Sequence, residues 1–357
     1  MMRFHPTEEQ LAIQDALRGT LADSFPKERL HELVDGDTDF DKPSWDALMA
    51  LGLGGLALPE IWGGAGLGLL DLAMAIEVLG DGAAAGPILQ HCLVALAIAS
   101  SASEELKARW LPELASGGTV ATVAWGGEWL PEKWTVKIED GVLSGMVRYV
   151  PGANAAHLFL VGTAGGGLAL CELEAGMRVS AQHSSDRSRR TATVTFKNAK
   201  AVELFEPGDP TVARLFDAAL VLIAADALGG AQHCVDLSVA YAKEREQFGQ
   251  PIGRFQALKH QLAGMALEVE PARAMMWYAA YAWDMQLAEA SRAAAMAKAH
   301  IADRFVSVAR AAVAAHGGIG YTWEYGLVIW FRRSMFDRAY LGSPAVHRAR
   351  AADLAGW

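Results

Sequence analysis

Two stretches of this sequence decide how the chain folds: residues 241–256, which read YAKEREQFGQPIGRFQ, and residues 315–324, which read AHGGIGYTWE. In the first stretch, Arg245 comes at the end of a predicted helix and before a loop that contains Gly249 and Gly253. A planar guanidinium in that position can grip a pyrophosphate through paired hydrogen bonds. The same segment offers further amide groups and a ring face, from Gln247, Gln256 and Phe248.

The second stretch carries the glycine-rich run Gly317-Gly318-Ile319-Gly320. The backbone amides of such a run can come close to a dinucleotide because few side chains stand in the way. His316 adjoins the run, where it either touches a bound group or packs at the end of the preceding helix. Alone, Arg245 would be interpreted as a surface arginine and the glycines as a helix-ending turn. Because both stretches occur in one chain, they favour a dinucleotide site.

The hydrophobic pattern predicts an α+β fold that is mostly α. Residues 1–118 show helical spacing and form an expected N-terminal helical domain, in which Ser44 is expected to cap a short helix. Residues 119–207 change to short β-rich runs between turn residues, which predicts a small central β domain. Residues 208–357 return to the helical period and predict a C-terminal domain like a four-helix bundle.

Long helices are the main expectation for the C-terminal domain. The first should run from about Val212 to Glu246, and the loop 247–253 should interrupt the helical pattern. Two more should follow, ending near Trp283 and near Ala315. The order helix, then β, then helix is unusual and narrows the choice of fold.

The composition excludes several classes of protein. With 357 residues, 52% of them hydrophobic and 20% charged, the chain can form a large core and is not intrinsically disordered. Its formal net charge of −10 has the wrong sign for a non-specific binder of nucleic acid or of anionic membranes. The longest apolar run, residues 218–231, is too short to span a bilayer.

The start of the chain and the cysteines predict the compartment. The first residues are polar and lack the apolar core of a signal peptide. Cys92, Cys171 and Cys234 are far apart in sequence, so we expect neither a disulfide framework nor structural zinc, but a reducing cytoplasm. We also expect no metal site, because no pair among the ten histidines has the i, i+4 spacing of a helical zinc site with a third ligand nearby.

At residues 241–256 and 315–324, and in its helix–β–helix order, the chain resembles the acyl-CoA dehydrogenase family. The resemblance implies the fold of that family and α,β-dehydrogenation of an acyl-CoA thioester with FAD. It also implies that both stretches hold the ADP portion of an FAD that is bound mainly in the neighbouring subunit. The residues implied to contact this FAD are Arg245, Gln247, Phe248, Gln256, His316, Gly317, Gly318 and Gly320.

The catalytic base of the family is missing from both of its usual positions. A carboxylate must remove the α-proton of the thioester while a hydride passes to the flavin. In the family a glutamate does this from one of two places, which correspond here to Ala219 and Leu341. Neither side chain can accept a proton. Asp217 lies two residues from Ala219 and so points well away on a helix, and we interpret it as a helix N-terminal carboxylate or a ligand contact.

The residues that hold the flavin ring in the family are replaced as well. A Thr-Glu-Pro sequence corresponds here to Gly126-Gly127-Glu128, and an aromatic-Ile-Thr-Asn sequence corresponds to Tyr149-Val150-Pro151-Gly152, whose proline supplies neither hydroxyl nor N–H. Trp125 and Trp129 fall where the ring would sit, so an indole could fill the emptied site. Near the glycine run, which otherwise keeps the pattern of the family, Ala314 stands where a glutamine is common.

This division of lost and retained residues resembles the smaller subunit of the heterotetrameric α2β2 acyl-CoA dehydrogenases of bacteria, which oxidise steroid-derived CoA thioesters. The resemblance implies a homologous partner that carries the base and most of the acyl-CoA pocket, and an electron-transfer flavoprotein or similar acceptor. Two alternatives stay open. The chain could be a homo-oligomeric flavoenzyme of the same fold with different chemistry, such as a flavin monooxygenase or a dehydrogenase that uses another carboxylate, for example Asp217. It could also be a flavin-free scaffold subunit.

Two charged runs complete the analysis: residues 186–190, which read DRSRR, and the pair Arg332-Arg333. We expect both to be solvated faces or interface charges, with a phosphate contact to CoA as the less favoured role of the first.

Overall fold

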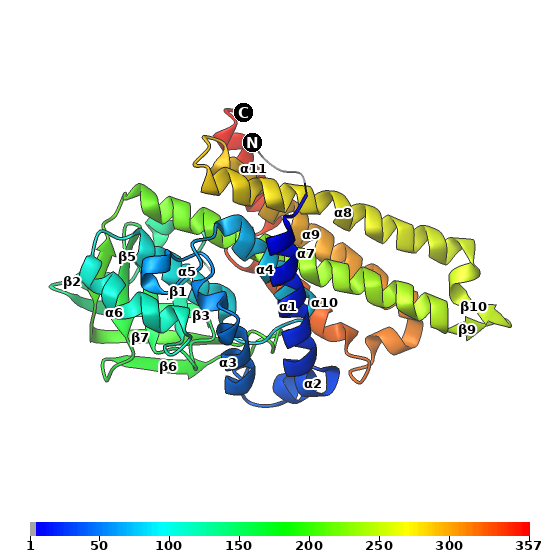
Figure 1. The fold of residues 1–357 in the computed structure, drawn as a ribbon. Helices are drawn as coiled ribbons and strands as arrows, with labels where there is room; N and C mark the ends of the chain where they lie inside the picture. Colours follow the sequence, from blue (N-terminus) through cyan, green and yellow to red (C-terminus); the bar gives the residue numbers. More distant parts are fainter. Residues whose placement is uncertain (1–4, 127) are drawn as a thin grey trace.

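The computed structural model describes residues 5–126 and 128–357 and has the expected order of helices, sheets and helices (Figure 1). The polar start before His5, and Gly127 of the Gly126-Gly127-Glu128 run, lie outside the described residues. The first elements are α1 (Glu8–Ser24), α2 (Lys27–Asp35), α3 (Lys42–Ala50), η1 (Leu53–Gly55), η2 (Glu60–Trp62), α4 (Leu69–Asp81), α5 (Ile88–Ser100) and α6 (Glu104–Ala115). The mostly helical α+β class is therefore confirmed.

Local sequence explains where the first helices begin. At α1, Thr7 Oγ1 accepts the Gln10 N–H (3.2 Å) and the Gln10 side chain accepts the Thr7 N–H (2.9 Å), which is a capping box. The expected cap at Ser44 is wrong, because the helix starts earlier and Asp41 accepts the Ser44 N–H (3.1 Å). Pro43 fits there because the first turn of a helix needs no N–H from it.

Two four-stranded sheets form the middle of the chain, in the orders β1-β4-β5-β8 and β2-β3-β7-β6. The strands are β1 (Ala121–Ala124), β2 (Lys137–Glu139), β3 (Val142–Pro151), β4 (Leu158–Thr163), β5 (Gly167–Glu172), β6 (Met177–Ala181), β7 (Thr191–Lys200) and β8 (Val202–Phe205), with the short η3 (Pro131–Lys133) before β2. β1 pairs in parallel with β4, and the other pairs within these sheets are antiparallel. A separate small core that includes Phe159 and Phe196 belongs to this region.

The C-terminal third is a bundle of long helices around α7. Its elements are α7 (Pro210–Glu244), β9 (Glu246–Gln247), β10 (Gln250–Pro251), η4 (Ile252–Arg254), α8 (Gln256–Asp284), α9 (Ala290–His316), η5 (Gly317–Tyr321), α10 (Leu327–Ala339) and α11 (Pro344–Leu354). α7 packs against α4, α8, α9 and α10. It approaches α4 closely at Gly80 and Gly229, where a Cβ would collide with a backbone carbonyl of the facing helix.

A buried ion network joins the β region to the bundle. Arg189 Nη2 lies 3.0 Å from Asp226 Oδ2 and 2.8 Å from Asp337 Oδ1, and Arg333 donates to both carboxylate oxygens of Asp226. The interpretation as solvated charges is therefore wrong for Arg189 and Arg333, which are buried against carboxylates from α7 and α10. Arg187 and Arg190 are only half-buried, and their guanidinium groups donate to backbone carbonyls of Val34 and Gly36.

Among the described residues, no helix is long and apolar enough to cross a membrane.

Candidate functional site

The arginine loop, residues 245–255, joins α7 to α8. Arg245 is the C-cap of α7, and its N–H donates to the Tyr241 carbonyl (2.8 Å). Strands β9 and β10 then form a short hairpin at the far end of the two long helices, on the right of Figure 1. Phe248 has φ +55° and is 92% exposed at this hairpin, and Arg245, Gln247 and Gln256 are exposed too. The loop therefore presents a guanidinium, amides and a ring outward, away from its own core.

The glycine turn, residues 317–320, directly follows α9. Gly317 has φ +65°, and a Cβ on Gly317 or Gly318 would meet nothing within 4 Å. Their backbone is therefore open to a ligand. Gly320 has a different reason to be glycine, because a Cβ there would lie 2.8 Å from the Val313 carbonyl oxygen of α9. The first two glycines leave room outside, and the third lets the turn fold back on its helix.

A cavity of about 640 Å³ lies beside the glycine turn, between α9 and α10. Its wall is mostly apolar and includes Ala314, and the charged residues that line it are Arg310 and Arg332. The Arg332 guanidinium lies 5.0 Å from the Trp323 ring centroid. The cavity thus combines an apolar wall, two guanidinium groups and the open backbone of Gly317.

Sequence reasoning missed both cavity arginines. Arg310 lies seven residues before Gly317, with Val313 and Ala314 between them, so all four share one face of α9. This spacing could have revealed Arg310. Arg332 belongs to α10 and reaches the cavity only through the packing of α10 on α9, for which the sequence holds no local signal.

His316 is not exposed at the glycine turn. It is 4% exposed, and its ring stacks on the Tyr241 ring with centroids 4.5 Å apart and planes at 28°. Its Nδ1 lies 2.7 Å from the Ala312 carbonyl oxygen. Burial lowers the pKa of His316, although the carbonyls of Ala312 and Leu237 oppose the shift. A buried ring held in this way does not favour the direct cofactor contact expected of His316.

The two base positions are buried in the middle of the molecule. Ala219 lies on α7 one turn after Phe216, whose ring centroid is 6.0 Å from that of Trp125. Leu341 follows α10, and a Cβ on the glycine after it would lie 3.2 Å from the Cβ of Trp129. The loop between β1 and β2 therefore brings tryptophans close to both base positions.

The backbone after Leu341 is fixed by two buried side chains. His347 Nε2 lies 2.8 Å from the Leu341 carbonyl oxygen, and Lys298 Nζ lies 3.3 Å from the Gly342 carbonyl oxygen. Burial lowers the pKa of His347 to about 4 and that of Lys298 to about 8. A neutral His347 is a suitable donor for the Leu341 carbonyl. Both His347 and Lys298 therefore serve to hold the backbone here.

Asp217 is engaged within the chain. Its carboxylate accepts hydrogen bonds from Ser291 Oγ (2.5 Å) and from Arg350 Nη2 (2.7 Å). Asp217 therefore ties α7 to α9 and α11. We expected a helix N-terminal carboxylate or a ligand contact, and neither expectation describes this role. Both carboxylate oxygens of Asp217 are thus engaged by partners within the chain.

Four aromatic side chains, three from the β1–β2 loop and one from α7 and here called the indole cluster, lie together beside a cavity of about 370 Å³. They are Trp125, Trp129, Trp134 and Phe216. Trp125 and Trp134 stack with ring centroids 5.5 Å apart and planes at 22°. Nearby, the Pro151 carbonyl of β3 accepts a hydrogen bond from Thr122 Oγ1 (2.5 Å). Trp125 of the β1–β2 loop and Pro151 at the end of β3 are thus both used for contacts within the chain.

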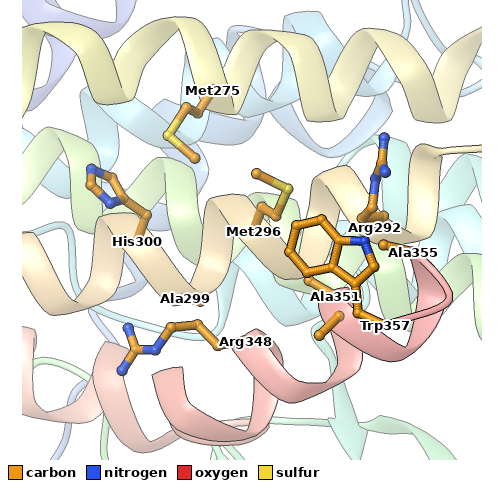
Figure 2. A pocket seen from close by; sticks show the side chains of 10 residues that line it. Met275, Arg292, Met296, Ala299, His300, Arg348, Ala351, Ala355 and Trp357 are labelled. Carbon is orange, nitrogen blue, oxygen red and sulfur yellow. The ribbon is translucent and has the colours of Figure 1, made fainter.

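A further cavity, of about 520 Å³, lies between α8, α9 and α11 (Figure 2). Met275 and Met296 point toward one another across it, with the indole of Trp357 nearby. None of the residues predicted for the site lines this cavity. Over residues 5–126 and 128–357, no group of three or more histidine, cysteine, aspartate or glutamate side chains is placed to hold a metal ion.

Comparison with known proteins identifies the family. The acyl-CoA dehydrogenase N-terminal domain model matches residues 7–118, and the acyl-CoA dehydrogenase C-terminal domain model matches residues 209–355. The chain belongs to the acyl-CoA dehydrogenase family. Members of this family are FAD-dependent oxidoreductases, so the dehydrogenase chemistry expected from the sequence is that of the family.

Relatives match the chain over nearly its whole length. Acyl-CoA dehydrogenase IpdE2 of Mycobacterium tuberculosis is 30% identical, over 95% of this chain and 95% of that protein. A solved steroid acyl-CoA dehydrogenase, Tcur3481–Tcur3483, is 30% identical, with a TM-score of 0.89 and 98% of both chains covered. Butyryl-CoA dehydrogenase of Megasphaera elsdenii has a TM-score of 0.86 at 24% identity, over the full length of both chains, and shares the fold.

Proposed function

We propose that this chain is a subunit of a heteromeric acyl-CoA dehydrogenase that lacks the catalytic base and completes the FAD site of a homologous partner. The observation that carries the proposal is that both base positions, Ala219 and Leu341, hold buried apolar side chains. Such side chains cannot remove the α-proton of a thioester, so the partner must supply the carboxylate. The alternative that Asp217 acts as the base is disfavoured by its ion pair with Arg350.

The arginine loop and the glycine turn, together called the clamp, support the second half of the proposal. Arg245 and Phe248 are exposed in the arginine loop, and Gly317 lines a cavity that also holds Arg310 and Arg332. Guanidinium groups and free backbone amides suit a pyrophosphate, and an apolar wall suits an adenine ring. The residues present therefore fit the ADP end of FAD.

The ring end of FAD fits less well. Trp125 is buried against Trp134 and Phe216, so these rings fill part of the space between the β1–β2 loop and α7, and a cavity of about 370 Å³ remains beside Trp129 and Phe216. When bound to the complete enzyme, FAD accepts the hydride from the thioester. In our proposal this chain holds only the ADP end, and the partner holds the ring and the substrate.

The steroid-related neighbour supports a substrate class. The solved Tcur3481–Tcur3483 protein is described as a steroid acyl-CoA dehydrogenase. We therefore assign this chain to an α2β2 assembly that oxidises a steroid-derived acyl-CoA, bound mainly in the partner's pocket. An electron-transfer flavoprotein or a similar protein is the proposed electron acceptor.

Co-expression with a homologous acyl-CoA dehydrogenase chain that carries a glutamate at a base position tests this function. We expect a stable complex with one FAD for each partner chain, and turnover that a glutamate-to-glutamine change in the partner abolishes. The chain purified alone should be colourless and inactive. Stoichiometric FAD and acyl-CoA oxidation by the lone chain would overturn the proposal.

The indole cluster allows a second test that needs no partner. In the Trp125→Ala variant, the loss of a buried indole should cost about 3–5 kcal/mol of unfolding free energy and open a cavity. Riboflavin, which lacks the ADP end, should then raise the melting temperature of this variant but not of the wild type. Trp110→Ala, which removes another buried indole from α6, is the matched control and should gain nothing from riboflavin. A response in the wild type would show that the ring space is already open.

A further inference from the structure

We propose that His316 is a positioning residue that joins the arginine loop to the glycine turn, so that the two halves of the clamp hold one relative position before any cofactor binds. The consequence for FAD rests on the proposed function. The mechanical link between the two segments is independent of it and can be measured on the lone chain.

The link to the arginine loop runs through Tyr241. The Tyr241 ring stacks on the His316 ring with centroids 4.5 Å apart. The backbone carbonyl of Tyr241 accepts the Arg245 N–H (2.8 Å), which ends α7 and sets the direction in which the loop leaves the helix. Because Tyr241 carries both the stacked ring and the carbonyl that accepts the Arg245 N–H, movement of His316 is transmitted to the residue that carries the guanidinium.

The link to the glycine turn is direct. A Cβ on Gly320 would lie 2.9 Å from the Cβ of His316, so the turn folds tightly over this histidine. On the other side, the Tyr325 ring lies with its centroid 4.9 Å from that of His316, and Lys27 Nζ lies 5.3 Å from the centroid of Tyr325. The His316 ring therefore contacts the end of α7 and the segment that leads into α10, and its Cβ lies against the glycine turn.

The surroundings of His316 suit a fixed, neutral ring. The short distance from Nδ1 to the Ala312 carbonyl (2.7 Å) orients the ring within its own helix. Its aromatic neighbours, Tyr241 and Tyr325, offer ring faces rather than carboxylates. A contact of this kind depends on ring shape more than on charge, so phenylalanine should replace the histidine better than alanine does.

Hydrogen exchange of the lone chain tests the link. The Ile252 N–H donates to Arg245 O (2.8 Å) in the arginine loop, and the Thr322 N–H donates to Ile319 O (3.0 Å) just after the glycine turn. In His316→Ala we expect exchange at both amides to rise about tenfold, because two aromatic contacts are lost. In His316→Phe, exchange should stay within about threefold of the wild type, as the stacking is kept. His300→Ala, on the same helix but beside the remote cavity, is the matched control.

Faster exchange at Thr322 alone, with Ile252 unchanged, would overturn the link. Equal acceleration across the β strands would also overturn it, since that reports global destabilisation. In the co-expressed complex, His316→Ala should raise the FAD dissociation constant about tenfold while kcat with saturating FAD stays close to wild type. If exchange responds as expected but the wild-type complex binds no FAD, the proposed function fails and the link stands.

Discussion

At the scale of single residues, the proposed division of labour depends on side-chain chemistry and exposure. Ala219 and Leu341, at the two expected base positions, are apolar and buried. Arg245 is charged and exposed, and it ends a helix beside an open loop. The first two side chains can only pack, and the third is free to bind.

Arg245→Ala should weaken FAD binding by the co-expressed complex. Loss of a charge-assisted contact costs about 1.5–3 kcal/mol, which corresponds to roughly a 10- to 150-fold higher dissociation constant. The quantity to measure is the FAD dissociation constant by fluorescence titration of the deflavinated complex. Arg254→Ala, an exposed arginine in the same loop, should have a much smaller effect. Equal losses in both variants would mean that the loop contributes only general positive charge.

At the scale of elements, ion pairs hold the β region against the bundle. Burial alone would raise the pKa of Asp226, but the guanidinium groups of Arg189 and Arg333 lower it to about 2. Burial raises the pKa of Asp337 well above its usual range. Three buried aspartates, Asp186, Asp226 and Asp337, therefore share two guanidinium groups, and removal of either cation leaves buried negative charge with less compensation.

Arg333→Met should destabilise the fold by about 3–5 kcal/mol, because Asp226 loses the partner that donates to both of its oxygens. Arg332→Met, at the next position, is the matched control. The Arg332 guanidinium lies over the Trp323 ring, and this contact should contribute about 1 kcal/mol or less to the unfolding free energy. Urea unfolding at neutral pH measures both values. Similar losses of unfolding free energy in the two variants would contradict a stabilising role of the ion network.

At the scale of the whole molecule, the N-terminal helices are fastened to the β region by a buried carboxylate. Asp39, between α2 and α3, accepts the Arg190 N–H that precedes β7 (2.6 Å). Burial raises the pKa of Asp39 to about 7, although the hydrogen bond and the charge of Arg190 oppose the shift. The folded chain therefore binds a proton there that the unfolded chain releases near pH 4.

This linkage predicts how stability depends on pH. Because the folded-state pKa of Asp39 is raised, its contribution is fully present below about pH 4 and is lost as pH rises toward about 7. Asp39→Asn removes the titration, so the wild type should lose unfolding free energy relative to this variant as the pH rises from about 4 to about 7. Urea unfolding at several pH values checks this. A constant difference between variant and wild type over that range would show that Asp39 does not titrate in it.

Local pattern by itself determined much of this protein. The helical and β periods predicted the class and the order of the elements, and α8 and α9 end within one residue of the expected positions. The two motif stretches were enough to predict the family, and the identity of Ala219 and Leu341 was enough to propose that the base is missing. These properties depend on residues close together in the chain, or on the chemistry of one side chain, and so they can be found without coordinates.

Only the tertiary structure decided which charges are buried and which elements meet. Arg189 and Arg333 belong to runs that look solvated, and they are buried because carboxylates from α7 and α10 face them. Arg332 reaches the cavity beside the glycine turn, and Tyr241 meets His316, because helices far apart in sequence pack side by side. Such contacts depend on how whole elements cross, and no local period records that geometry.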